Sequence, residues 1–498
     1  MKIIFYATLS VFEDMLAQIM DLATIERKKG NTIYFVCCDS SINYCSMISK
    51  PKKNYHACIT CQYKQRTLLK DFGIDKENIF FMKNKKYKKS LIPNYDSIEK
   101  VNSYQYKGVN IGTGVVSTLI SYTRDINVDL NLHKSLFDDI FTTALTVVDN
   151  IEEIFEEIQP NKVYFYNGRL VEYKTVLEYC KYKSIPFVTY EVGSIITKYT
   201  LYENTLPHDP QYNARKAIEL AEQNKEEVKK QGEDWYIKRR QGKIPEEKID
   251  INYTKKQEKN VLPSSFDSNE KKGKVIISIF NSSEDEIIAV GQDIWKTYGH
   301  QSHITEELLT AFEKSDSNYF FYLRIHPNQA NLLHTREVQN LFALEKKFSN
   351  LEVIPPDDRV DTYALIKRSK KILSFGSTVG IEATFWGKVS IVYGTSFFKY
   401  ITDSAYFPDS LEALIQLLKD DNLKPLSKEA AIIYGYYIGE RGTDLKYYEY
   451  PIFKTENKLE SKNSFIYWYL QCYTFFINNR FPMRFFPKKI IYHLFLKK

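Results

Sequence analysis

The sequence predicts an α/β protein with two Rossmann-like domains and a C-terminal helical tail. Two observations carry this prediction: apolar strands alternate with helices in the first 200 residues, and the same alternation restarts at residue 274. Such alternation is typical of parallel sheets that are covered by helices. The length of 498 residues fits two or three domains of about 100–200 residues each.

In the N-terminal half, apolar strands are followed by segments whose apolar residues repeat at helical spacing. We expect strands at 2–7, 32–37, 163–166 and 186–190, and helices at 11–29, 135–158 and 171–183. The stretch 50–110 is rich in Lys, Tyr and Asn and is weakly periodic, so we expect an elaborated loop region there. The resulting N-terminal domain spans 1–252 and carries a Cys-containing basic insertion at about 38–110.

The C-terminal half begins after a charged stretch, and residues 253–273 have the composition of a linker. We expect strands at 274–280, 319–325, 351–354, 371–374 and 389–393, and helices near 303–314, 361–369, 379–386 and 410–420. These elements predict a second domain at 274–425, with a crossover and tail at 426–498.

The composition, with 43% hydrophobic and 26% charged residues, is that of a soluble globular protein and excludes a disordered, collagen-like or disulfide-framework chain. The N-terminus lacks the pattern of a signal peptide. The longest apolar-rich stretch, 466–477, is shorter than the roughly 20 residues that a spanning helix needs. We therefore expect a cytoplasmic protein that is at most peripheral to the membrane.

The net charge of +7 is unevenly placed along the chain. Residues 50–90 hold twelve basic and three acidic residues, and the tail at 464–498 holds six basic residues, no acidic residue and twelve aromatic rings. Aromatic rings with cations suit the interface of an anionic membrane. Packing on the N-terminal domain is an alternative for the tail, and stacking on nucleic acid is the weaker reading.

A small-residue loop at 374–383 follows a predicted strand and opens a predicted helix. Its glycines, Gly376 and Gly380, would let backbone N–H groups approach an anion at the helix N-terminus. Ser377 and Thr378 could donate hydrogen bonds to phosphate oxygens, and Glu382 could reach a nucleotide ribose. A strand-to-helix turn with a helix cap is the structural alternative.

A second motif, Arg324-Ile325-His326-Pro327, ends a predicted strand one unit earlier. Because ligands of parallel sheets bind outside the carboxyl ends of the strands, His326 could protonate or hydrogen-bond a diphosphate in place of a metal. A structural strand-end histidine is the alternative. Ser283 follows another strand and has capping-box spacing to Glu286, and we expect it to cap a helix and to face the donor with Arg324.

The N-terminal half offers candidates for acceptor binding after two of its strands. Asn167 and Arg169 follow one strand, Glu191 ends the next, and His208 lies further along. Arg169 could hold an anionic group, and Glu191 could act as general base toward an acceptor hydroxyl, with His208-Asp209 as a second base candidate. Structural roles are the alternative for each.

Catalysis without a divalent metal is expected, because no Asp-x-Asp motif stands at a nucleotide loop. The pair Asp357-Asp358 is interpreted as a helix cap. A structural metal is a separate question, since Cys38, Cys45, Cys58 and Cys61 could together hold zinc, with His56 as another ligand. Unligated thiols or a disulfide remain open as alternatives.

Taken together, the motifs between residue 274 and about 398 resemble glycosyltransferases of the GT-B fold, and most closely bacterial capsular or surface-polysaccharide biosynthesis proteins with an HP motif and a Ser/Thr loop. The resemblance implies that the sheets of the two domains face a central cleft. It also implies that His326, Ser377 and Thr378 hold the phosphates of a nucleotide-sugar donor and that Glu382 holds its ribose.

We therefore expect a glycosyltransferase that moves a sugar from a nucleotide-sugar to a bacterial capsular or lipopolysaccharide-type glycan, free or lipid-linked, at the cytoplasmic face of the membrane. The N-terminal domain would bind the acceptor. The alternatives are a teichoic-acid-type polyol-phosphate transferase, a non-hydrolysing sugar-nucleotide epimerase, and a non-catalytic relative that binds glycan or serves as a scaffold.

Overall fold

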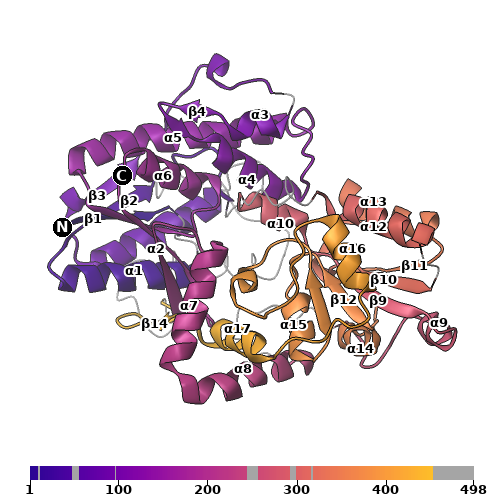
Figure 1. Ribbon diagram of the computed structural model, residues 1–498. Helices are drawn as coiled ribbons and strands as arrows, with labels where there is room; N and C mark the ends of the chain where they lie inside the picture. Colours follow the sequence, from indigo (N-terminus) through magenta and orange to yellow (C-terminus); the bar gives the residue numbers. More distant parts are fainter. Residues whose placement is uncertain are drawn as a thin grey trace.

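The computed structural model describes residues 1–8, 12–46, 55–95, 97–243, 256–291, 299–315 and 318–452. The predicted tail at 464–498 lies outside these residues. The described chain forms two α/β lobes, one on each side of a central region where α4 and α10 meet (Figure 1).

In the described residues, the first sheet has seven strands in the order β14-β8-β7-β6-β1-β2-β3. Five adjacent strands, β3, β2, β1, β6 and β7, are parallel to one another. β8 runs antiparallel to both of its neighbours, β7 and β14. The bounds are β1 (Lys2–Ala7), β2 (Thr32–Cys38), β3 (Ile79–Met82), β6 (Lys162–Tyr166), β7 (Phe187–Val192), β8 (Lys198–Glu203) and β14 (Thr443–Asp444).

Helices cover both faces of this sheet. Alternate side chains of β1 enter two different cores, because successive residues of a strand point to opposite faces. Ile3 and Phe5 pack on the side of α1 and α2, whereas Ile4 and Tyr6 pack on the side of α4, α5 and α6. We call this sheet with these helices the N-terminal lobe: α1 (Glu13–Lys28), α2 (Tyr55–Phe72), α4 (Gly112–Thr123), α5 (Lys134–Ile158) and α6 (Val171–Tyr182).

The prediction of a loop region at 50–110 was wrong. It contains α2 and β3, and β3 pairs in parallel with β2 and so extends the main sheet. A short helix and a hairpin follow, at α3 (Ile98–Asn102), β4 (Gln105–Tyr106) and β5 (Val109–Asn110). Part of its positive charge is paired within the lobe, since Lys85 lies 2.5 Å from Glu153 and Lys107 lies 2.8 Å from Asp149 of α5.

The second sheet has five parallel strands, within the described residues, in the order β11-β10-β9-β12-β13. Its strands are β9 (Val275–Phe280), β10 (Tyr319–Arg324), β11 (Leu351–Ile354), β12 (Lys371–Ser374) and β13 (Val389–Val392). We call this sheet with its helices the C-terminal lobe: α10 (Glu284–Ala289), α12 (Gln301–Ser315), α13 (Arg336–Lys347), α14 (Thr362–Arg368), α15 (Val379–Phe385) and α16 (Leu411–Lys419).

Both sheets have the doubly wound strand order, in which the first strand lies in the middle. The chain direction across the sheet reverses between β1 and β6 in one lobe and between β9 and β12 in the other. Crevices at such switch points are where parallel sheets bind their ligands. The predicted α/β class with two parallel-sheet halves is confirmed.

The lobes touch through α4 and α10. Ser117 of α4 donates its hydroxyl hydrogen to the carbonyl oxygen of Ala289, and the Arg124 Nε of the same segment lies 2.6 Å from the carboxylate of Asp285. Asp285 is almost fully buried, and burial raises its pKa to about 6. Among the described residues, no helix is long and apolar enough to cross a bilayer.

Three further helices, α7 (Pro210–Gln223), α8 (Lys225–Arg240) and α17 (Glu429–Glu440), pack together beside α15. The crossing of α8 and α17 is close because two glycines meet there. A Cβ on Gly232 would lie 2.3 Å from the carbonyl oxygen of Ile432, and one on Gly435 would lie 2.7 Å from the carbonyl oxygen of Gly232. The crossing thereby fixes α8, whose last turn reaches the C-terminal lobe.

Replacing Gly232 by alanine is expected to lower the free energy of unfolding by about 1–3 kcal/mol, because the added methyl meets backbone that cannot rotate away. Urea denaturation followed by circular dichroism measures the loss. Lys230→Ala, on the exposed side of α8, is the control and should leave the midpoint unchanged. Equal midpoints for the two variants would show that the helices can separate without cost.

Candidate functional site

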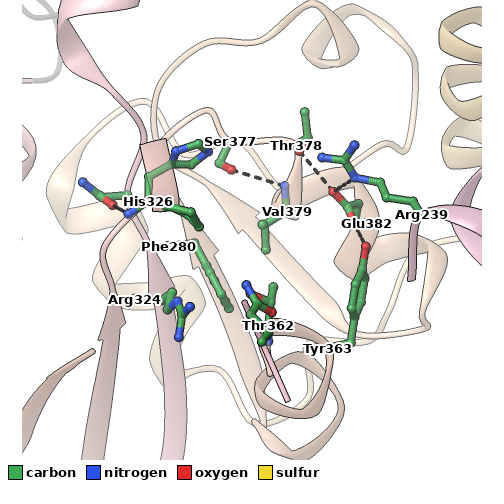
Figure 2. Close-up of a pocket in the computed structure, with 13 residues that line it drawn as sticks. Arg239, Phe280, Arg324, His326, Thr362, Tyr363, Ser377, Thr378, Val379 and Glu382 are labelled. Carbon is green, nitrogen blue, oxygen red and sulfur yellow. Dashed lines mark hydrogen bonds and ion pairs between the residues drawn. The ribbon is translucent and has the colours of Figure 1, made fainter. Parts of the chain in front are cut away.

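The candidate site is a cavity at the switch point of the C-terminal lobe. Residues after the carboxyl ends of β9, β10 and β12 converge on it, as the topology requires. Figure 2 shows His326 and Ser377 on one side and Arg239, Tyr363 and Glu382 on the other. The lining residues are Arg239, Gln257, Phe280, Asn281, Arg324, His326, Pro327, Thr362, Tyr363, Ser377, Thr378, Val379 and Glu382.

His326 lines this cavity as the sequence predicted. Its backbone N–H donates to Oδ1 of Asn281 at 2.6 Å, and its ring Nδ1 lies 2.9 Å from Oδ1 of Asn328. The buried Asn281 also donates to Gln329 at 2.8 Å, so a side chain at the end of β9 holds the segment after β10. Burial lowers the pKa of His326, which favours the neutral imidazole.

The Ser/Thr loop passes beside the histidine, with Ser377 next to His326 (Figure 2). Ser377 accepts a weak hydrogen bond from the backbone N–H of Val379 at 3.4 Å, and the Thr378 hydroxyl donates to Glu382 at 3.1 Å. Gly376 has a φ of +77°, and a Cβ there would lie 2.5 Å from the carbonyl oxygen of Thr395. Gly380 lets α15 pack against β12, since a Cβ added at this position would lie 2.7 Å from Ser374 Oγ. Both glycines thus shape the loop through packing, and their contact with a donor remains a prediction.

Glu382 also lines the cavity, but its carboxylate already has protein partners. Tyr363 donates its hydroxyl to one oxygen at 2.7 Å, and Arg239 Nε lies 3.2 Å from the other. The Glu382 side chain is only 4% exposed. A ribose would therefore have to compete with these bonds, and the ribose-binding role remains a prediction.

Arg324 lies at the base of the cavity with its guanidinium turned toward the backbone. Its terminal nitrogens donate to the carbonyl oxygens of Val360 and Asp358 at 3.1 and 3.0 Å. Burial lowers its pKa to about 10, so the group stays charged at neutral pH. This geometry gives Arg324 a structural role in holding the loop before α14. A direct contact with a donor stays a prediction.

Two predicted helix caps have different roles from those expected. Ser283 is the N-cap residue of α10, but its hydroxyl donates to Asn328 at 2.6 Å and makes no capping bond. The prediction of a capping box between Ser283 and Glu286 was therefore wrong, because the Ser283 hydroxyl makes no hydrogen bond to the helix backbone. The helix cap expected at Asp357-Asp358 was also wrong, because Asp361 caps α14 by accepting from the backbone N–H of Tyr363 at 2.9 Å.

The predicted acceptor residues gather at the carboxyl ends of β6 and β7. The amide of Asn167 and the hydroxyl of Tyr166 both donate to the carboxylate of Glu191, whose pKa is raised by burial. Arg169 is near enough to Glu191, Asp285 and Glu286 for each to influence its pKa, which burial lowers. This cluster of the N-terminal lobe therefore faces α10 of the C-terminal lobe.

His208 belongs to the same cluster. Burial and the nearby Arg169 guanidinium lower its pKa to about 4, so it is neutral at physiological pH. The adjacent Asp209 caps α7 by accepting from the backbone N–H of Tyr212 at 2.9 Å. His208 can thus accept a proton only weakly, and Glu191 is the stronger base candidate.

The four predicted zinc ligands lie around the ends of β2 and α2. Cys38 Sγ lies 3.7 Å from the Ser41 hydroxyl, and Cys61 Sγ lies 3.9 Å from the carbonyl oxygen of Thr8. In the part of the chain that the structure describes, no three His, Cys, Asp or Glu residues are grouped so that they could hold a metal. The side chain of His56 lies outside the described residues. Zinc binding stays an untested prediction.

Sequence reasoning missed several residues of the cavity. Arg239 comes from α8, and Gln257 from the stretch interpreted as a linker, where its side-chain oxygen accepts from the backbone N–H of Thr362 at 2.9 Å. Asn281 and Asn328 stand directly beside the quoted motifs, and that position was the signal available for finding them. Arg239 had no comparable signal.

Comparison with protein families bears on the same region. Residues 208–404 match the model of a family described as capsule polysaccharide biosynthesis protein. The predicted resemblance is confirmed. The matched segment contains Arg239, His326, the Ser/Thr loop and Glu382, and it includes every residue that lines the cavity. No functionally curated protein matched the chain.

Solved structures show distant likenesses. The β-Kdo 2,4 transferase KpsC from Thermosulfurimonas dismutans is 13% identical over 56% of this chain and 79% of its own, with a TM-score of 0.34. The S. aureus MnaA–UDP co-structure is 12% identical over 88% and 93%, with a TM-score of 0.31. The UDP-GlcNAc 2-epimerase from Neisseria meningitidis is 12% identical over 88% and 96%, with a TM-score of 0.25. These scores are too low to carry an argument about function.

Proposed function

We propose that this protein is a glycosyltransferase of capsule polysaccharide synthesis that uses a nucleotide-sugar donor. The observation that carries the proposal is the cavity at the switch point of the C-terminal lobe, where His326, Ser377 and Thr378 lie within the segment that matches the family. An imidazole and two hydroxyls suit the oxygens of a diphosphate. The nearby Arg239 adds a guanidinium, which suits phosphate recognition.

The donor phosphates would sit between His326 and the Ser/Thr loop. A protonated His326 can offset the negative charge that develops on the leaving phosphate when the sugar–oxygen bond breaks. The reaction then needs a group that takes the proton from the attacking hydroxyl of the acceptor. We assign this role to Glu191, because burial raises its pKa and makes it a stronger base than an exposed carboxylate.

The acceptor would bind at the N-terminal lobe, near Asn167, Arg169 and His208. The pKa of Arg169 is influenced by Glu191 of the N-terminal lobe and by Asp285 and Glu286 of the C-terminal lobe. Arg169 therefore lies where a substrate could contact both lobes. Its guanidinium suits a carboxylate or phosphate on the growing glycan. Attachment to an anionic membrane through 464–498 and a cytoplasmic location are parts of the same proposal.

A ligand screen tests the donor. Melting temperature is measured with UDP, GDP, CMP, CDP, their sugars and CDP-polyols, for the wild-type protein and for Ser377→Ala. One nucleotide is expected to raise the melting temperature of the wild type, because a ligand that binds only the folded state stabilises it, and to raise it less in the variant. Stabilisation by CDP-polyols alone would favour polyol-phosphate transfer, and no stabilisation by any nucleotide would overturn the proposal.

A further inference from the structure

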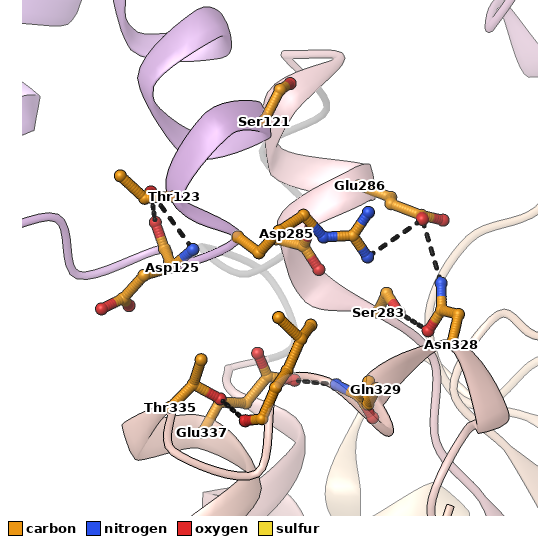
Figure 3. Close-up of polar contacts among 12 residues, drawn as sticks. Ser121, Thr123, Asp125, Ser283, Asp285, Glu286, Asn328, Gln329, Thr335 and Glu337 are labelled. Carbon is orange, nitrogen blue, oxygen red and sulfur yellow. Dashed lines mark hydrogen bonds and ion pairs between the residues drawn. The ribbon is translucent and has the colours of Figure 1, made fainter. Parts of the chain in front are cut away.

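A chain of polar contacts leads from His326 to the N-terminal lobe. Nδ1 of His326 lies 2.9 Å from Oδ1 of Asn328, and Nδ2 of Asn328 donates to Glu286 at 3.0 Å. The same Glu286 oxygen lies 3.2 Å from Nη2 of Arg124, which follows α4. Figure 3 shows Ser283, Asn328 and Glu286 in this arrangement, with Asp285 beside them.

Glu286 determines which way the amide of Asn328 points. An ionised carboxylate has only acceptors, so the amide nitrogen must face it and the amide oxygen must face away. The turned-away oxygen then accepts from the Ser283 hydroxyl at 2.6 Å and faces His326. The reverse orientation would place two acceptor oxygens 3.0 Å apart.

Nδ1 of His326 consequently has two competing neighbours. The amide oxygen of Asn328, at 2.9 Å, requires a hydrogen on Nδ1. The backbone N–H of the same residue, at 3.3 Å, requires a lone pair there. The shorter contact is the one that Glu286 supports, so it sets the tautomer of the neutral ring.

We propose that Glu286 and Asn328 are positioning residues that hold neutral His326 with its hydrogen on Nδ1 and its lone pair on Nε2. Arg124 holds Glu286 from the side of the N-terminal lobe, so the contact between the lobes supports the same tautomer. The functional consequence of this tautomer rests on the proposed function. With the lone pair on Nε2, the ring can donate a hydrogen bond to a donor phosphate only after Nε2 takes up a proton.

The tautomer can be measured without any donor. Long-range ¹H–¹⁵N correlation spectra of histidine-labelled full-length protein distinguish protonated from unprotonated ring nitrogens, and His326→Gln assigns the signals. In the wild type at a pH where the ring is neutral, we expect Nδ1 to be protonated and Nε2 unprotonated. Glu286→Ala is expected to exchange the two shifts, because the amide of Asn328 can then turn and the backbone N–H becomes the better partner.

Two further variants separate positioning from a general loss of structure. Glu286→Gln keeps a side-chain oxygen for Asn328 and is expected to retain the wild-type tautomer. Glu307→Ala removes a carboxylate that lies 3.6 Å from the exposed His303, so it should alter the signals of His303 and leave those of His326 unchanged. Arg124→Ala is expected to shift part of the population toward the tautomer of Glu286→Ala.

The outcomes decide the proposal independently of catalysis. Unchanged His326 shifts in Glu286→Ala, or an Nε2-protonated ring in the wild type, would overturn it. Unchanged shifts in Arg124→Ala would overturn the role of the lobe contact. If no nucleotide binds but the shifts behave as expected, the proposed function fails while the positioning of His326 stands.

Discussion

Replacing His326 by alanine is expected to slow donor turnover by about 100-fold or more, because a positioned acid–base group typically contributes that much. The imidazole lines the cavity that is proposed to bind the donor. Initial rates of nucleotide release with a donor identified by thermal shift measure the effect. Fold integrity is checked by melting temperature, which should change little because the ring faces a cavity.

The matched control is His303→Ala, which removes an imidazole that is 66% exposed on α12. Its rate should equal that of the wild type. A His326→Ala variant that turns over donor within a few-fold of the control would remove His326 from the chemistry, although the cavity could still bind the nucleotide.

The pH dependence of donor binding provides a second measurement on the same residue. Burial lowers the pKa of His326, whereas a bound diphosphate would raise it, so binding is expected to take up a proton. Glu286, Arg239 and Arg124 are the charged groups that influence the ring. Affinity is expected to fall as pH rises above the pKa of the free protein, by up to about tenfold per pH unit. His326→Ala should lose this slope.

The fold was predictable where local pattern and tertiary structure agree. The strands at 2–7 and 32–37 and the helix between them were located within two residues, because a buried parallel strand and an amphipathic helix carry clear patterns. Gly30 follows this helix with a φ of +83°, a conformation that glycine adopts without strain. The alternation in the C-terminal lobe was recovered for the same reason.

Two N-terminal helices could not be recognised from their own residues. α2 mixes small, aromatic and polar residues along its length, and its larger buried apolar side chains, Leu68, Leu69 and Phe72, stand near its end. α4 is rich in Gly and β-branched residues, which have low helix propensity. Gly112 begins α4 because a Cβ there would lie 1.8 Å from the carbonyl oxygen of Val101, a constraint that only the folded chain reveals.

The site was predictable to the extent that its residues follow strands. His326, Ser377, Thr378 and Glu382 were found because parallel topology brings the carboxyl ends of β10 and β12 together. Arg239 lies on α8, and its position depends on the glycine crossing with α17. Nothing in the charged sequence of α8 distinguishes Arg239 from the other basic residues there. Its pairing with Glu382 could therefore not be inferred from the sequence.

The ion pair with Arg239 means that replacing Glu382 should affect the stability of the fold. Replacing Glu382 by alanine removes a buried carboxylate from Arg239, Tyr363 and Thr378 at once. Removing one member of a buried ion pair typically costs about 3–5 kcal/mol, because the remaining charge is left without compensation. We expect Glu382→Ala to lower the free energy of unfolding by about 3 kcal/mol.

A double-mutant cycle separates this structural role from ribose binding. Chemical denaturation is measured for Glu382→Ala, Arg239→Ala and the double variant. The double variant should be less destabilised than the two single changes added together, because Glu382 and Arg239 contact each other and both single changes remove the same ion pair. Glu382→Gln keeps an oxygen for Tyr363 and should recover part of the stability. If Glu382→Ala instead melts like the wild type and loses only nucleotide affinity, the carboxylate serves the ligand, and its contacts with Arg239 and Tyr363 are readily exchanged for those with a ribose.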